Sequence, residues 1–224
     1  MLIAEQQRLL FVHNPKAAGT AVKQALAKAL KLDRVAAVRE FGMGEHLPLL
    51  DIAWQLRGYR VDLTGFLILG VLRDPLERLA SFWRFGRAPT ADGIGSRIAK
   101  GLGHLGLSER AMTAMVERVQ HYSLERWVRW SIDMTWCPWA ELKGGPSVIE
   151  RPQMSWFSGD RERPLLFRFD RLGDLVAFLA KARGIEIALG RENESGAEQP
   201  EFTRWVVEWA RETYADDYEA FKDF

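Results

Sequence analysis

The sequence predicts an α/β protein with a mainly parallel sheet, and two observations support this prediction. Short apolar runs typical of buried strands occur at Leu9–His13, Phe66–Leu72 and Leu165–Phe169. Each run precedes a segment whose apolar residues recur at helical spacing. Strands that alternate with helices favour a parallel sheet, because a parallel pair needs a long crossover connection.

Local signals predict each helix of the first third in turn. Apolar residues repeat every three or four positions over Thr20–Lys31, and a second helix is expected over Pro48–Leu56. Asp74 is a residue type that caps helices, and Pro75 suits the first helical position. A third helix should therefore open there and run to about Phe85.

Helical patterning returns over Ser108–Met134, Leu172–Lys181 and Pro200–Phe221, the last with an amphipathic face. The stretch from 86 to 107 is rich in glycine and poor in large apolar side chains, which is typical of a surface loop or lid. With no repeat along it, the chain is expected to form one domain, 1–224.

Composition excludes several classes of protein. Lys plus Arg number 31 and Asp plus Glu 30, so the net charge of +1 argues against nucleic-acid binding. The single cysteine, Cys137, allows no internal disulfide and suits a reducing compartment. No apolar run is long enough to span a bilayer, no signal peptide is expected, and no residues have metal-ligand spacing. These features predict a cytoplasmic, metal-free protein.

The most informative segment is the turn after the first strand. Its residues are Pro15, Lys16, Ala17, Ala18, Gly19 and Thr20. A turn that opens a helix aims unpaired backbone N–H groups at one point, with the positive end of the helix dipole behind them. Lys16 adds a positive charge, so the turn suits a phosphate or sulfate. It is not a Walker A loop, because the lysine precedes the glycine. An ordinary turn with Thr20 as N-cap is the alternative.

A second candidate contact to an anion follows the strand at Phe66–Leu72. Arg73 lies at the carboxyl end of that strand, where open α/β sheets bind ligands, and its guanidinium can hold two phosphate oxygens. Ser81 lies eight residues later on the expected helix and can point back toward it. A surface pair between Asp74 and Arg78 would explain those two residues, but not Arg73 and Ser81.

These two segments carry a resemblance to a known family. P-K-A-A-G-T resembles the 5′-phosphosulfate loop of sulfotransferases that use 3′-phosphoadenosine 5′-phosphosulfate (PAPS), closest to the carbohydrate sulfotransferase branch. V-L-R-D-P-L-E-R-L-A-S at 71–81 resembles the 3′-phosphate site of that family. The resemblance implies a P-loop-like three-layer fold with a central mainly parallel sheet. It also implies that Pro15–Thr20, Arg73 and Ser81 bind the nucleotide.

Three later segments are similar to the family in a looser way. R-P-Q-M-S-W at 151–156 resembles its P-Q-S-x-[YWF] stretch, but Met154 is inserted, so the roles of Gln153 and Ser155 stay open. L-L-F-R-F-D-R-L at 165–172 and Y-A-D-D-Y-E-A-F at 214–221 resemble its last strand and closing helix. Residues 86–145 are unmatched and are expected to form an insertion that binds the acceptor.

Sulfuryl transfer requires a base for the acceptor hydroxyl and positive partners for the sulfuryl oxygens and the leaving phosphate. Lys16 suits the positive partner. His46 lies where the carbohydrate branch often carries its base, and an imidazole titrates near neutral pH. Glu45 is the alternative base. The resemblance also implies that His13 packs under the loop.

The resemblance implies an enzyme that transfers a sulfuryl group from PAPS to a hydroxyl of a saccharide or glycolipid and releases adenosine 3′,5′-bisphosphate. Two alternatives remain open. One is a nucleotide-dependent phosphotransferase, with Leu165–Asp170 as a Walker B strand, and the other is a non-catalytic module that binds adenosine bisphosphate. Four tryptophans are expected mainly in the hydrophobic core, although some of them could line an acceptor cleft and stack on sugar rings. They are Trp127, Trp130, Trp136 and Trp139.

Overall fold

The computed structural model describes residues 1–32, 46–87, 117–133, 149–190 and 198–222. The chain divides into two compact units. The first contains Met1–Asp74, Gln153–Glu194 and Asp216–Phe224, and the second contains Pro75–Pro152 and Ser195–Ala215. Much of the expected acceptor-binding insertion at 86–145 lies outside the described residues, as do Glu45, Trp136, Cys137 and Trp139.

The first unit is built on a four-stranded sheet with the order β1-β2-β3-β4. The strands are β1 (Leu2–Ala4), β2 (Leu9–Phe11), β3 (Leu67–Leu72) and β4 (Leu165–Arg168). β2, β3 and β4 are parallel, which confirms the mainly parallel α/β class. β1 pairs antiparallel with β2 at the edge and was not expected. A strand of three residues is too short for its pattern of apolar residues to be recognised in the sequence.

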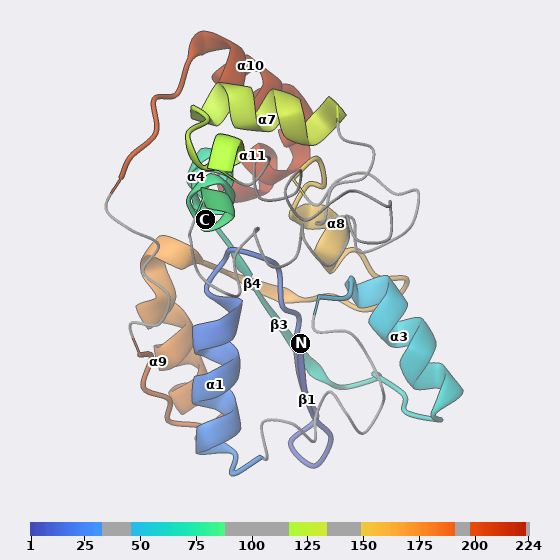
Figure 1. Ribbon diagram of the computed structural model, residues 1–224. Helices are drawn as coiled ribbons and strands as arrows, with labels where there is room; N and C mark the ends of the chain where they lie inside the picture. Colours follow the sequence, from blue (N-terminus) through green and yellow to red (C-terminus); the bar gives the residue numbers. More distant parts are fainter. Residues whose placement is uncertain (33–45, 88–116, 134–148, 191–197, 223–224) are drawn as a thin grey trace. The chain divides into compact units, whose positions relative to one another are not determined.

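Helices cover both faces of this sheet (Figure 1). On one face, α1 (Gly19–Ala29) and α9 (Leu172–Arg183) lie side by side, and their apolar residues share one core with β1, β2 and β3. The other face carries α3 (Leu49–Gly58) and the short α8 (Met154–Phe157). A Cβ at Gly70 of β3 would lie 2.2 Å from the Phe157 ring, so only glycine lets α8 pack there.

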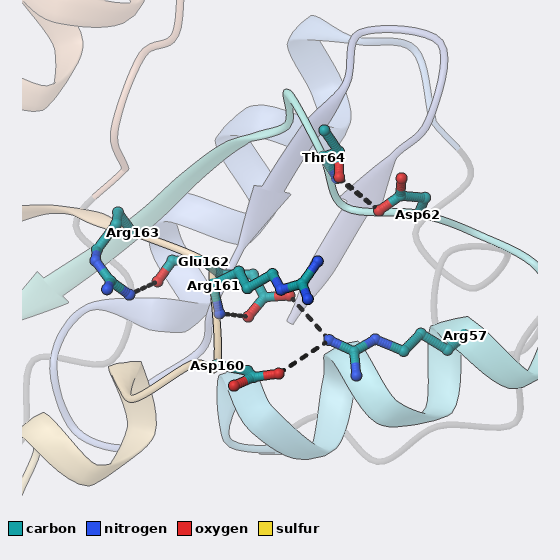
Figure 2. A network of polar contacts seen from close by, with 7 residues as sticks. All are labelled: Arg57, Asp62, Thr64, Asp160, Arg161, Glu162 and Arg163. Carbon is teal, nitrogen blue, oxygen red and sulfur yellow. Dashed lines mark hydrogen bonds and ion pairs between the residues drawn. The ribbon is translucent and has the colours of Figure 1, made fainter.

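At the amino ends of the strands, ion pairs join α3 to the segment before β4 (Figure 2). Arg57 lies 3.8 Å from Asp160 and 3.7 Å from Glu162, while Asp62 accepts hydrogen bonds from both the N–H and the hydroxyl of Thr64. Arg57 and Asp160 are both more than half exposed, and exposed pairs of this kind contribute little to stability, typically below about 1 kcal/mol each. The Arg57–Asp160 pair therefore lies at the surface, in contrast to the buried network described below.

The second unit contains α4 (Pro75–Arg87), α7 (Leu124–Asp133) and α10 (Arg204–Thr213), which pack on one another. The expected single helix over 108–134 is wrong in its described part. Residues 117–120 are helical, and the chain then leaves the helix until α7 begins. Ser123 caps α7, because its hydroxyl accepts the N–H of Arg126 at 3.3 Å. Trp127 is fully buried, which confirms its expected place in the core.

The expected helix over 200–221 is also two helices, α10 and α11 (Ala215–Lys222). The backbone at Tyr214 departs from helical geometry, with φ −113° and ψ 31°. The Tyr214 side chain is buried, and its hydroxyl donates to the carbonyl of Ile149. A tertiary hydrogen bond of this kind leaves no trace in helical periodicity. None of the helices in the described parts of the chain has the length and apolar character needed to cross a membrane.

Candidate anion-binding site

The turn between β2 and α1 adopts an unusual backbone conformation. Lys16 and Ala18 both have positive φ angles, 65° and 57°. Helix α1 begins at Gly19, its N-cap is Ala18, and no side chain caps it. The N-cap expected at Thr20 is therefore wrong, since Thr20 lies inside the first turn of the helix. The first N–H groups of α1 have no acceptor within the helix and are available to an anion.

Left-handed backbone at a residue with a side chain costs about 1–2 kcal/mol. The other described non-glycine residues with positive φ are Arg8, Lys31 and Arg60. Arg8 lies in the β1–β2 hairpin turn, and the other two follow the ends of α1 and α3, where left-handed residues commonly terminate helices. Lys16 and Ala18 instead precede a helix. Strain stored at such a place is a mark of a functional turn.

The His13 side chain packs against this turn at Gly19. It is 4% exposed, and a Cβ added to Gly19 would lie 1.7 Å from its Cδ2 and 2.1 Å from its Nε2. Position 19 therefore requires glycine because the imidazole occupies the space of a side chain. Burial lowers the pKa of His13 well below its usual value of 6.5, and the nearby His46 adds to this effect. His13 is thus a buried packing group against the turn, as expected.

Replacement of Gly19 by Ala is expected to lower the free energy of unfolding by about 1–3 kcal/mol, because the new methyl group overlaps the buried His13 ring. Urea denaturation measures the change. Gly173→Ala on α9 is the matched control, since nothing lies within 4 Å of the place its methyl group would take. That variant should be neutral or gain up to about 1 kcal/mol from helix propensity. Equal stabilities for the two variants would contradict the close contact between Gly19 and His13.

His46 lies beside the same turn, although it is far away in sequence. Its Nδ1 is 3.4 Å from the carbonyl oxygen of His13, and the two rings are 4.2 Å apart between centroids. A carbonyl only accepts hydrogen bonds, so this contact favours the tautomer with a proton on Nδ1. In that tautomer Nε2 carries the lone pair, which is the form a base needs. The base predicted from sequence is therefore adjacent to the turn.

Arg73 follows β3 directly and reaches the same turn. Its Nη1 donates to the carbonyl of Lys16 at 3.3 Å, and its Cζ lies 4.3 Å from the centroid of Phe169 in the 3₁₀ turn η1 (Phe169–Arg171). The ring holds the guanidinium by a cation–π contact. The guanidinium of Arg73 thus lies against the backbone of the Lys16 turn, at one end of the sheet. Ser81 is buried on α4 of the second unit, so its role beside Arg73 stays a prediction.

Sequence reasoning left the role of Gln153 open and assigned no role to Asn14 or Asp217, the other buried polar residues of its network. Asn14 and Gln153 are each 1% exposed and are joined by a hydrogen bond of 2.9 Å. Gln153 also bonds the backbone of Arg73, and Asp217 holds the backbone of Gln153. The only sequence signals were the P-Q pair and the acidic residue of the closing helix. Neither indicates which partners these side chains have. The role of Ser155 stays open.

The phosphotransferase alternative requires a free carboxylate at the end of β4. Asp170, the expected Walker B carboxylate, accepts two hydrogen bonds from Arg168, at 2.9 and 2.7 Å. These bonds lower the pKa of Asp170 below its usual value. The carboxylate is therefore occupied by a guanidinium, which disfavours a role as a magnesium ligand. The described residues contain no cluster of histidine, cysteine and acidic side chains that could hold a metal ion.

No family model, curated protein or solved structure matches this chain. Together the residues of the site provide the first N–H groups of α1, the cationic residues Lys16 and Arg73, and an imidazole whose Nδ1 faces the His13 carbonyl. This combination can bind an anionic ester and remove a proton near it.

Proposed function

We propose that this protein is a PAPS-dependent sulfotransferase with a P-loop-like three-layer fold. It transfers a sulfuryl group to a hydroxyl of a saccharide or glycolipid. The observation that carries the proposal is the convergence of the Lys16 turn, Arg73 and His46 at one end of the β2–β3 pair. A phosphotransferase would also use the cations and a base, but it would in addition need a free Walker B carboxylate for Mg²⁺, and Asp170 is paired with Arg168.

Each residue has a task in this reaction. The N–H groups of the turn and Lys16 hold the 5′-phosphosulfate, and Arg73 with Ser81 holds the 3′-phosphate. The acceptor hydroxyl gives its proton to His46 while its oxygen forms a bond to sulfur. The bond between sulfur and the bridging phosphate oxygen breaks, and Lys16 stabilises the charge on the departing phosphate. The products are a sulfate ester and adenosine 3′,5′-bisphosphate.

The proposal is tested by incubating the protein with PAPS and a panel of saccharides, glycolipids and simple alcohols. Mass spectrometry should detect an acceptor that gains one sulfuryl group, with release of adenosine 3′,5′-bisphosphate. Binding of the bisphosphate without transfer to any acceptor would favour the non-catalytic module. Transfer of a phosphoryl group from a nucleoside triphosphate that depends on Mg²⁺ would favour the phosphotransferase.

The 3′-phosphate is expected to determine nucleotide preference. Adenosine 5′-phosphosulfate, which lacks this group, should bind at least about tenfold more weakly than PAPS, because charged hydrogen bonds to it contribute about 1.5–3 kcal/mol each. Isothermal titration calorimetry measures both affinities. Arg73→Ala should reduce the preference, whereas Arg183→Ala at the exposed end of α9 should keep it. Equal affinity of the wild-type protein for the two nucleotides would overturn the role of Arg73.

A further inference from the structure

Gln153 pairs with Arg73 in the way a neighbouring strand would. Its side-chain Nε2 donates to the Arg73 carbonyl at 2.7 Å, and its Oε1 accepts the Arg73 N–H at 3.0 Å. Arg73 is the first residue beyond β3, so its backbone has left the ladder that orders Leu67–Leu72. The amide of Gln153 satisfies both of its backbone groups. It thereby fixes the direction in which the Arg73 side chain leaves the chain.

The same amide is linked to the chain that leads into the Lys16 turn. Asn14 donates from Nδ2 to Gln153 Oε1 at 2.9 Å and to the Val71 carbonyl at 3.1 Å. Asn14 lies between β2 and the turn, whereas Val71 and Arg73 belong to β3 and its end. The buried Oε1 of Gln153 therefore accepts hydrogen bonds from Asn14, which follows β2, and from Arg73, which follows β3. This sharing sets the spacing between the Lys16 turn and Arg73.

Asp217 of α11 holds Gln153 itself. Its two carboxylate oxygens accept the N–H groups of Gln153 and Met154, each at 2.8 Å. Asp217 is 1% exposed, so these bonds are shielded from water. Hydrogen bonds to a charged acceptor are stronger than neutral ones, and two of them restrict rotation as well as position. The network is thus anchored at a point more than sixty residues away in sequence.

We propose that Gln153 is a positioning residue for the anion site, with Asp217 as its anchor. Gln153 holds Arg73 at the place from which its guanidinium meets both Lys16 and Phe169. This inference rests on the proposed function, because it assigns Arg73 to the 3′-phosphate. A tilt of the Arg73 backbone would move the guanidinium away from that phosphate and leave the 5′ side of the nucleotide with its N–H groups and Lys16.

The test compares adenosine 3′,5′-bisphosphate with adenosine 5′-monophosphate, which differ only in the 3′-phosphate. Gln153→Met keeps the volume of the side chain without its amide. Calorimetry should show that this variant loses at least about tenfold in affinity for the bisphosphate and less than about threefold for the monophosphate. Asp217→Asn should shift the preference in the same direction by a smaller factor. If Gln153→Met does not fold, Asp217→Asn still tests whether the network determines the preference for the bisphosphate.

A matched control separates positioning from loss of stability. Leu179→Ala removes a fully buried side chain of α9 in the same unit and is expected to destabilise by about 2–5 kcal/mol. It should keep the wild-type preference for the bisphosphate, which a generally loosened protein would lose. The inference is overturned if Leu179→Ala loses the preference as strongly as Gln153→Met, or if neither Gln153→Met nor Asp217→Asn changes it.

Inorganic sulfate distinguishes failure of this inference from failure of the proposed function. If the wild-type protein binds sulfate but does not prefer the bisphosphate, the nucleotide assignment fails, and sulfate affinity then tests Gln153. A weaker sulfate affinity in Gln153→Met would uphold positioning of an anion site without a nucleotide. An unchanged sulfate affinity would overturn it. A wild-type protein that binds neither sulfate nor the bisphosphate overturns both proposals.

Discussion

His46→Ala is expected to slow sulfuryl transfer to an aliphatic alcohol by about 10²–10⁴-fold, the usual contribution of a positioned base. Affinity for adenosine 3′,5′-bisphosphate should change little, because the turn and Arg73 remain in place. An acidic phenol should lose far less rate, since it is already partly ionised at neutral pH and needs little help from a base. Steady-state rates with a matched alcohol and phenol measure the two losses.

Two further variants sharpen the result. His46→Asn keeps a side-chain N–H that can donate to the His13 carbonyl but has no basic nitrogen, so it should be as slow as His46→Ala with the alcohol. His121→Ala removes an exposed histidine of the second unit and should retain the wild-type rate. Equal losses with alcohol and phenol would show that His46 packs or positions rather than accepts the proton. Glu45 would then be the base to test.

Lys16→Ala is expected to reduce kcat by about 10²–10³-fold, because the charge that it stabilises grows as the phosphate departs. Binding of adenosine 3′,5′-bisphosphate should weaken by a smaller factor, since Arg73 still holds the 3′-phosphate. Single-turnover rates and calorimetry separate the two effects. Wild-type kcat in the variant would reduce Lys16 to a residue of the turn without a role in the chemistry.

The positive φ of Lys16 provides a control for backbone effects. Lys16→Gly also removes the ammonium group, but it relieves a backbone strain of about 1 kcal/mol. It should therefore be more stable than Lys16→Ala and equally slow, if charge rather than backbone shape drives catalysis. Lys28→Ala, at an exposed position in the last turn of α1, should keep the wild-type kcat.

Much of the first unit could be predicted from the sequence. The three parallel strands were expected within about one or two residues of their ends, because short apolar runs and their Pro or Gly boundaries are local signals. α4 begins at Pro75 as the Asp74-Pro75 pair predicted. The edge strand β1, the break at Tyr214 and the start of α7 after Ser123 were not predicted. Each depends on pairing or side-chain contacts that local periodicity does not report.

For this protein, the sequence alone determined the class of fold and the position of the Lys16 turn between β2 and α1, since residues adjacent in the chain specify both. Only the tertiary structure decided why Gly19 must be glycine, because His13 fills the space of its side chain. It also decided that Gln153 binds Arg73, eighty residues away. A buried amide can satisfy many partners, and strand pairing and helix packing select the one it meets. The cations could be proposed from sequence, whereas the network that orients them required the fold.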